Sequence, residues 1–176
     1  MIQLLRVDHR LLHGQVAVSW VQGLGSNCIF CVGDKVANDP VWKTTLKMGK
    51  PAGCKLVIKD MANAIEAINS GVTDKYKMII CVASIAEAKQ LADGCPQITS
   101  INLGNTKSKD EQRPDARKIS RQIFVTAAEE EDIRELAGRG IEVEIRALLT
   151  DLSLIADGGA SFRFLVGRYG AGKSFL

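Results

Sequence analysis

Short apolar runs alternate with amphipathic, helix-length stretches along most of this chain, and that alternation constrains the fold more than any other feature. The runs "IQLLRV" and "CIFCV" are typical of strands, and the stretch between them places Val16, Trp20 and Val21 on one helical face. Strands that alternate with helices imply right-handed crossovers. We therefore predict an α/β fold, an open doubly wound and mostly parallel sheet with helices on both faces.

Capping signals place the helices between these runs. Asp39 precedes Pro40 in the pattern of an N-cap and a first helical residue, and Asp60 opens the next helix. The stretches Ser84–Glu87 and Thr126–Glu129 read as capping boxes. The expected strands are residues 2–7, 28–32, 54–58, 77–83, 98–104, 119–125 and 141–148.

Composition excludes several functional classes. The 176 residues are 46% hydrophobic and 24% charged, the balance of a globular protein, and the net charge of +3 is too small to indicate a nucleic-acid partner. No apolar run approaches the roughly 18 residues of a membrane span. The start "MIQLLRVDHR" lacks the basic segment and long apolar core of a signal peptide, so we expect a cytoplasmic protein.

The cysteines are expected to be reduced thiols. Their odd number, without a secretion signal, argues against a disulfide framework. Cys28 and Cys31 form a C-x-x-C pattern, but residues three apart on a strand face opposite sides. We interpret all five as small buried hydrophobic residues: Cys28, Cys31, Cys54, Cys81 and Cys95.

Both histidines lie in "DHRLLHGQ", directly after the first expected strand. Ligands of doubly wound sheets bind at the carboxyl ends of strands, so this loop is a candidate site. Three interpretations compete there. The spacing of His9 and His13 is one that a shared metal requires, but the glutamate of H-E-x-x-H is missing and we predict no metal site. Alternatively both are solvated loop residues, or one is a nucleophile.

The nucleophile hypothesis fits His13 best. It precedes Gly14 at a strand-to-helix junction, where free backbone N–H groups and the helix dipole favour a phosphate. Arg6 and Arg10 can neutralise phosphoryl oxygens, and Asp8 can orient an imidazole or an arginine. An imidazole with a pKa of about 6.5 is partly neutral at cell pH and can attack phosphorus.

The segment "RVDHRLLHGQV" resembles the R-[IV]-D-x-R-L-[IL]-H-G-Q-V signature of IIB subunits of the mannose/fructose/sorbose-type sugar phosphotransferase system (PTS). "DKVANDPVWKTTLKM", "INLGN" and "GIEVEIRALLTD" also resemble family segments, in the same order, so that the resemblance covers residues 1 to about 151. It implies that His13 becomes the phosphorylated, catalytic residue of a protein-Npi-phosphohistidine–sugar phosphotransferase. The further family positions matched here are Arg6, Asp8, Arg10, Gly14 and Gln15 around the histidine, and Asn38, Asp39, Ser84, Asn102 and Gly104 nearby.

The resemblance also implies partners. His13 would receive the phosphoryl group from a phosphorylated IIA subunit or domain and pass it to a hexose or amino sugar carried by membrane subunits IIC and IID. The phosphoryl group is held covalently, so no separate cofactor is expected. The protein would be cytoplasmic, associated peripherally with the transporter, and a homodimer is possible. Asp39 and Ser84 are also explained as helix caps alone.

Two further segments carry secondary hypotheses. Residues 105–118 have a mild basic bias, suited either to docking a phosphorylated partner or to simple solvation. Residues 152–176 form an atypical C-terminal extension after the IIB-type domain of residues 1–151. Within it "GRYGAGKS" fits the phosphate-binding P-loop pattern, but only Phe175 and Leu176 follow, so the motif is incomplete. The competing hypothesis for the whole chain is a nucleotide- or anion-binding regulatory module without phosphotransfer, in which Lys173 would contact ATP.

Overall fold

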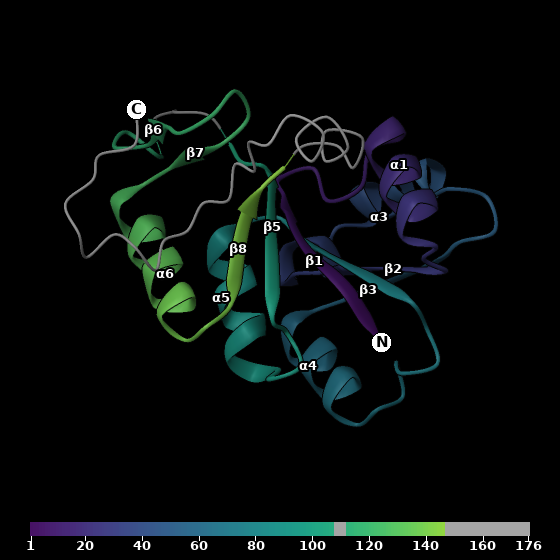
Figure 1. The fold of residues 1–176 in the computed structure, drawn as a ribbon. Helices are drawn as coiled ribbons and strands as arrows, with labels where there is room; N and C mark the ends of the chain where they lie inside the picture. Colours follow the sequence, from purple (N-terminus) through teal and green to yellow (C-terminus); the bar gives the residue numbers. More distant parts are fainter. Residues whose placement is uncertain (108–111, 147–176) are drawn as a thin grey trace.

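A single parallel sheet organises the chain in the computed structural model, which describes residues 1–107 and 112–146. Its six strands lie in the order β3-β2-β4-β1-β5-β8, and all the pairings between them are parallel (Figure 1). The predicted doubly wound α/β fold is therefore confirmed. The sheet strands are β1 (Ile2–Asp8), β2 (Cys28–Val32), β3 (Lys55–Lys59), β4 (Met78–Val82), β5 (Ser100–Asn105) and β8 (Glu142–Ile145).

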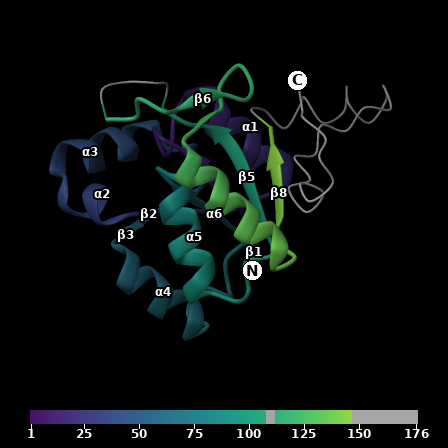
Figure 2. The same cartoon turned by 90° about the vertical axis from the view of Figure 1, so that its left-hand side faces the viewer.

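Helices cover both faces of the sheet. Helices α1 (Gly14–Leu24), α2 (Asp34–Asn38) and α3 (Pro40–Gly49) bury residues on one face, and α4 (Met61–Asn69), α5 (Ile85–Gly94) and α6 (Ala127–Gly138) on the other. Figure 2 shows α5 and α6 lying side by side across the sheet. None of the helices in the described parts of the chain is long and apolar enough to cross a membrane.

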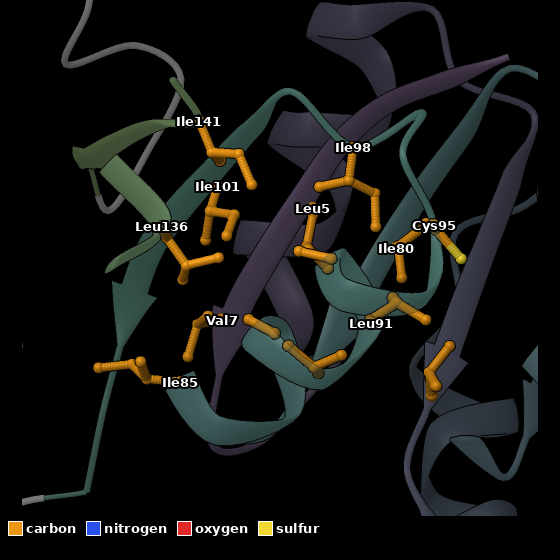
Figure 3. Close-up of a cluster of buried hydrophobic side chains, with 14 of the residues drawn as sticks. Leu5, Val7, Ile80, Ile85, Leu91, Cys95, Ile98, Ile101, Leu136 and Ile141 are labelled. Carbon is orange, nitrogen blue, oxygen red and sulfur yellow. The ribbon is translucent and has the colours of Figure 1, made fainter. Parts of the chain in front are cut away.

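Strand β1 divides its side chains between the two faces, and this alternation creates the setting of the site. Leu5 and Val7 belong to the larger apolar cluster, where Figure 3 shows them near Leu91 and Ile101. Leu4 belongs to the cluster on the opposite face, and Arg6 and Asp8 follow it at intervals of two. A buried arginine and a buried aspartate therefore lie on the face that α1 covers.

The expected helix caps are present, with one difference. Asp39 accepts a hydrogen bond from the Trp42 N–H (2.9 Å), and Thr126 with Glu129 forms a complete capping box. Ser84 accepts from the Glu87 N–H (3.2 Å), but the Glu87 carboxylate accepts from the N–H of Ala83 (2.7 Å) rather than from the cap residue. Only half of that predicted box follows the expected pattern.

The strand expected over residues 119–125 is wrong in extent. The segment instead forms part of a small antiparallel pair, β6 (Arg117–Lys118) with β7 (Phe124–Val125), outside the main sheet. The N–H groups of Ile119 and Ser120 both donate to the Ile123 carbonyl oxygen and close a turn. The polar residues in the middle of the run interrupt the alternation that a longer strand needs.

Candidate active site at the end of strand β1

A tight loop joins β1 to α1 and carries both histidines. Asp8 ends the strand, and His13 is the N-cap residue of α1. Leu11 has a φ of 61°, the only positive φ of a non-glycine residue in the described parts, and its side chain is buried. A bulky residue in this region is strained, so the buried contacts of Leu11 must stabilise the turn. Gly14 follows with a φ of 42°.

Asp8 holds this loop through its carboxylate. One oxygen, Oδ1, accepts from the Arg10 backbone N–H (3.1 Å) and lies 3.8 Å from Arg10 Nε. The other, Oδ2, accepts from the guanidinium of Arg6 (3.2 Å). Asp8 and Arg6 are both almost fully buried. The Asp8 carboxylate therefore contacts both arginines of the predicted site, Arg6 and Arg10.

Arg6 is fixed from several sides. Its Nη1 donates to Asn102 Oδ1 (2.7 Å) and to the backbone oxygen of Arg146 (3.2 Å). Burial lowers its pKa, and the neighbouring charge of Asp8 opposes that effect. Because its terminal nitrogens are engaged with protein groups, Arg6 is placed to order the site, and Arg10, whose side chain is about half exposed, is better placed to meet a ligand.

His13 lies between this charged cluster and the first turn of α1. Its Nε2 is buried and has no hydrogen-bond partner among the described residues. Burial lowers the His13 pKa most, and the positive charges of Arg10 and Arg6 lower it further against the opposing effect of Asp8. The lowered pKa favours the neutral imidazole at pH 7, the state in which a ring nitrogen is nucleophilic. The same positive charges favour an anionic ligand.

A small cavity of about 20 Å³ lies beneath His13. Arg6, Trp20 and Cys81 are among its lining residues, so it extends from the N-cap of α1 to the sheet.

In the part of the chain that the structure describes, no three His, Cys, Asp or Glu side chains are grouped to hold a metal ion.

The other predicted site residues separate into two groups. Asn102 and Gly104 join the cluster, because Asn102 bonds Arg6 and the Arg6 guanidinium lies directly against Gly104. Asn38, Asp39 and Ser84 instead hydrogen-bond within their own helices or helix termini. Gln15 is exposed in the first turn of α1.

His9 differs from His13 in its surroundings. Its backbone N–H donates to the Asn105 carbonyl oxygen (3.1 Å), which extends the pairing of β1 with β5. Burial lowers its pKa, and the charges of Arg10 and Lys107 act in the same direction. The two histidines share Asp8 and Arg10 as charged neighbours and differ in the third, which is Lys107 for His9 and Arg6 for His13.

The basic loop of residues 105–118 is in part structural. Arg113 forms an ion pair with Glu129, and Arg117 forms one with Glu130, so both fasten the β6–β7 pair to α6. Lys107 and Lys118 are exposed. Lys109, the incomplete P-loop pattern and Lys173 lie outside the described residues.

Sequence reasoning missed three residues of the site. Trp20 was expected only as a core residue of α1, yet the guanidinium carbons of Arg6 and Arg146 lie 5.4 and 5.0 Å from its ring centroid. Glu144 accepts from Asn102 Nδ2 (3.3 Å) and pairs with the Arg146 guanidinium. The available signal was the alternation of "EVEIR", which places the charged residues Glu142, Glu144 and Arg146 on one face of the strand; Glu144 pairs with Asn102 of β5.

Comparisons with known proteins identify the relatives of this chain. Residues 2–156 match the family model described as PTS system sorbose subfamily IIB component. The PTS system mannose-specific EIIAB component of Escherichia coli (strain K12) is 31% identical over 153 residues, which are 87% of this chain and 46% of that protein. This chain thus spans about half the length of that relative. The PTS system sorbose-specific EIIB component of Lacticaseibacillus casei is 30% identical, with 86% of this chain and 90% of that protein covered.

Solved structures agree with the fold. The IIBSor domain of the sorbose permease from Klebsiella pneumoniae superposes with a TM-score of 0.79 at 22% identity, over 92% of this chain and 99% of that chain. An N-acetylgalactosamine IIB component from Streptococcus pyogenes superposes with a TM-score of 0.76 at 27% identity, over 85% of this chain and 89% of that chain.

Proposed function

Because this chain belongs to the sorbose subfamily of PTS IIB components, we propose that it is a phosphocarrier that accepts a phosphoryl group on His13 and passes it to a sugar. The observation that carries this proposal is the position of His13. It is the N-cap of an 11-residue helix, beside Arg10 and Arg6, with a pKa lowered by burial and by those charges. A neutral nucleophile in a positive field suits phosphoryl transfer, which depends on positioning and charge neutralisation.

We assign the attack to Nδ1 of His13. The other ring nitrogen, Nε2, is enclosed, so a donor reaches the ring from the Nδ1 side. In the first transfer the new N–P bond to Nδ1 forms as the P–N bond of a phosphorylated IIA subunit or domain breaks. In the second, a sugar hydroxyl oxygen forms a bond to phosphorus, the Nδ1–P bond breaks and the hydroxyl proton is released. The phosphoryl group is carried covalently, and no other cofactor takes part.

Each neighbouring residue receives a role from its contacts. Arg10 stabilises phosphoryl oxygens, because its guanidinium is half exposed next to His13. The N–H groups of Gly14 and Gln15, at the start of α1, contribute the positive end of the helix. Arg6 is held by Asn102, lies against Gly104 and pairs with Asp8, and through this pair it keeps the loop in place. Asn38, Asp39 and Ser84 serve the helices next to the site.

The family implies the setting of this reaction. We propose a cytoplasmic location, peripheral association with membrane subunits IIC and IID, and transfer to a hexose or an amino sugar. The names of relatives support this sugar class, since they specify mannose, sorbose and N-acetylgalactosamine. A homodimer is a further proposal. We further propose a IIB-type domain of residues 1–151 and an extension of residues 152–176; the family match, which ends at residue 156, supports a boundary near this point.

Phosphorylation with matched histidine variants tests the proposal. The chain is incubated with phosphoenolpyruvate, the general phosphotransferase proteins and the cognate IIA. An acid-labile, base-stable label is expected on the natural chain and on His9→Ala, and none on His13→Ala. His9 is the matched control, since it is a histidine of the same loop. A label that persists in His13→Ala would overturn the assignment of His13. Loss of the label in His9→Ala, in addition to its loss in His13→Ala, would reopen the metal hypothesis.

A further inference from the structure

Helix α1 is fastened to the sheet by Trp20, which is 2% exposed. Trp20 comes seven residues after His13, about two helical turns, so it lies on the same side of α1 as the N-cap. The guanidinium carbons of Arg6, on β1, and of Arg146, just after β8, lie 5.4 and 5.0 Å from its ring centroid. Two cations against one buried indole stabilise its position by cation–π attraction.

Arg146 contacts the site by a second route. Its backbone oxygen accepts from Arg6 Nη1 (3.2 Å) and from Asn102 Nδ2 (3.2 Å). Its guanidinium pairs with Glu144, whose carboxylate also accepts from Asn102 (3.3 Å). The end of β8 therefore fixes Arg6, and Arg6 in turn fixes the Asp8 carboxylate that holds the His13 loop.

The charges of this cluster do not balance. Arg6, Arg10 and Arg146 oppose Asp8 and Glu144, which leaves 3 − 2 = +1. The Nε atoms of Arg6 and Arg146 are both buried and have no hydrogen-bond partner among the described residues. Arg6 pairs with Asp8 and Arg146 pairs with Glu144, so the excess positive charge is that of Arg10, whose side chain is about half exposed. Arg146 itself is a paired cation at a side-chain exposure of 12%, held in place by Glu144.

We propose that Arg146 is a positioning residue for His13: its guanidinium holds α1 through Trp20, and its backbone oxygen holds Arg6 against Asp8. This inference rests on the proposed function of His13 and adds to it a residue outside the signature segment. Arg146 acts through Trp20 and Arg6, so it shapes the site without contacting the phosphoryl group.

The test compares Arg146→Met and Arg146→Lys with Arg139→Met. Arg139 follows α6, before the start of β8, and forms exposed ion pairs with Asp93 and Glu135. The substitution is the same, but the site is not involved. Phosphoramidate is the phosphoryl donor, since it needs no partner protein: the His13–phosphorus bond forms as ammonia leaves. The readouts are the rate of His13 phosphorylation and the NMR titration midpoint of His13.

Arg146→Met is expected to slow phosphorylation about tenfold or more, because a small displacement of a reacting group has effects of that order. It is also expected to raise the His13 midpoint, because looser packing of α1 reduces the burial that lowers the His13 pKa. The rate and the midpoint of Arg146→Lys should lie between those of Arg146→Met and the natural chain, because lysine keeps the charge and lacks the planar guanidinium. Arg139→Met should match the natural chain in both readouts.

An unchanged rate with an unchanged midpoint in Arg146→Met would overturn the inference, and so would an equal loss in Arg139→Met. If Arg146→Met does not fold, Arg146→Lys and Glu144→Gln decide by the same two readouts. If the natural chain takes up no phosphate, the proposed function fails. The midpoint still tests the positioning in that event: a rise in Arg146→Met supports it, and no change refutes it.

Discussion

The guanidinium of Arg6 occupies the space that a side chain at position 104 would fill. A Cβ added to Gly104 would lie 2.0 Å from Arg6 Cζ and 2.2 Å from both terminal nitrogens. Arg6 pairs in register with Asn102, so its side chain extends two residues further along β5 to reach this glycine. Position 104 therefore requires glycine, because the Arg6 guanidinium lies where any larger side chain would have its Cβ atom.

Gly104→Ala should displace Arg6 and break its bonds to Asp8 and Asn102. We expect a loss of about 1–3 kcal/mol in the free energy of unfolding, the usual cost of inserting a group into a packed site, and slower phosphorylation of His13. Urea unfolding and phosphoramidate labelling measure the two effects. Gly138→Ala is the control, because nothing lies within 4 Å of a Cβ there and its helical site favours alanine.

A double variant sharpens this prediction. If Arg6 is the group displaced, Gly104→Ala should cost far less in a background that already carries Arg6→Ala. Additive losses in urea unfolding would show that the clash lies elsewhere.

Asp8→Asn should destabilise the fold strongly, because it leaves the buried Arg6 cation without its counter-ion. Breaking a buried pair from one side costs about 3–5 kcal/mol. Asp93→Asn removes the same charge from a surface network with Lys89 and Arg139, where we expect about 1 kcal/mol or less. Equal unfolding midpoints of the two variants in urea would contradict the central role given to Asp8.

The pH dependence of the site follows from its lowered histidine pKa values. The pKa values of His13 and His9 are both lowered from 6.5, so phosphorylation of His13 should level off at a lower pH than an unperturbed imidazole would allow, and fall below that pH as the imidazole is protonated. The unfolded chain binds more protons in that window. The free energy of unfolding should therefore decrease as pH falls from 6.5 through the folded-state pKa values, and lose nothing more below them.

Two cation variants separate the histidines. Arg10→Gln should raise the pKa of both, because Arg10 lowers each, whereas Lys107→Gln should raise that of His9 alone. NMR titration of the two imidazoles measures this directly. A His13 pKa that stays the same in Arg10→Gln would remove Arg10 from its place beside the ring.

The sequence predicted what depends on local pattern. Alternating apolar runs located all six strands of the sheet, and the residue types Asp39, Asp60 and Thr126 located three helix starts, because capping uses only neighbouring backbone groups. The position of the candidate site, in the loop after β1, was predicted from the rule that ligands bind at the carboxyl ends of the strands in parallel sheets.

Local sequence patterns could not predict the contacts between strands that are distant in the chain. The pairing of β5 with β8 brings Glu144 opposite Asn102, and no spacing along the chain indicates that register. Trp20 has the spacing of an ordinary core residue, and only the fold shows two arginines against it. The strand expected over 119–125 was wrong because its polar centre turns back on itself, through the bonds of Ile119 and Ser120 to Ile123.

The five cysteines should resist modification in the folded chain. Cys28 and Cys31 pack in the apolar clusters on opposite faces of the sheet, which agrees with the interpretation of their C-x-x-C pattern as a strand. Burial raises the pKa of Cys28 to about 11, so roughly one thiol in a thousand is ionised at pH 8, and the thiolate is the reactive form. All five are free and buried.

Iodoacetamide labelling followed by mass spectrometry tests this prediction. We expect little labelling of the native protein over minutes at pH 8 and five adducts after denaturation in urea, with no reductant needed. The denatured sample is the control, since five adducts formed without a reductant show that all five thiols are free and that none is in a disulfide. Rapid native labelling at Cys28 and Cys31 together would contradict their burial on opposite faces and restore the redox interpretation of the motif.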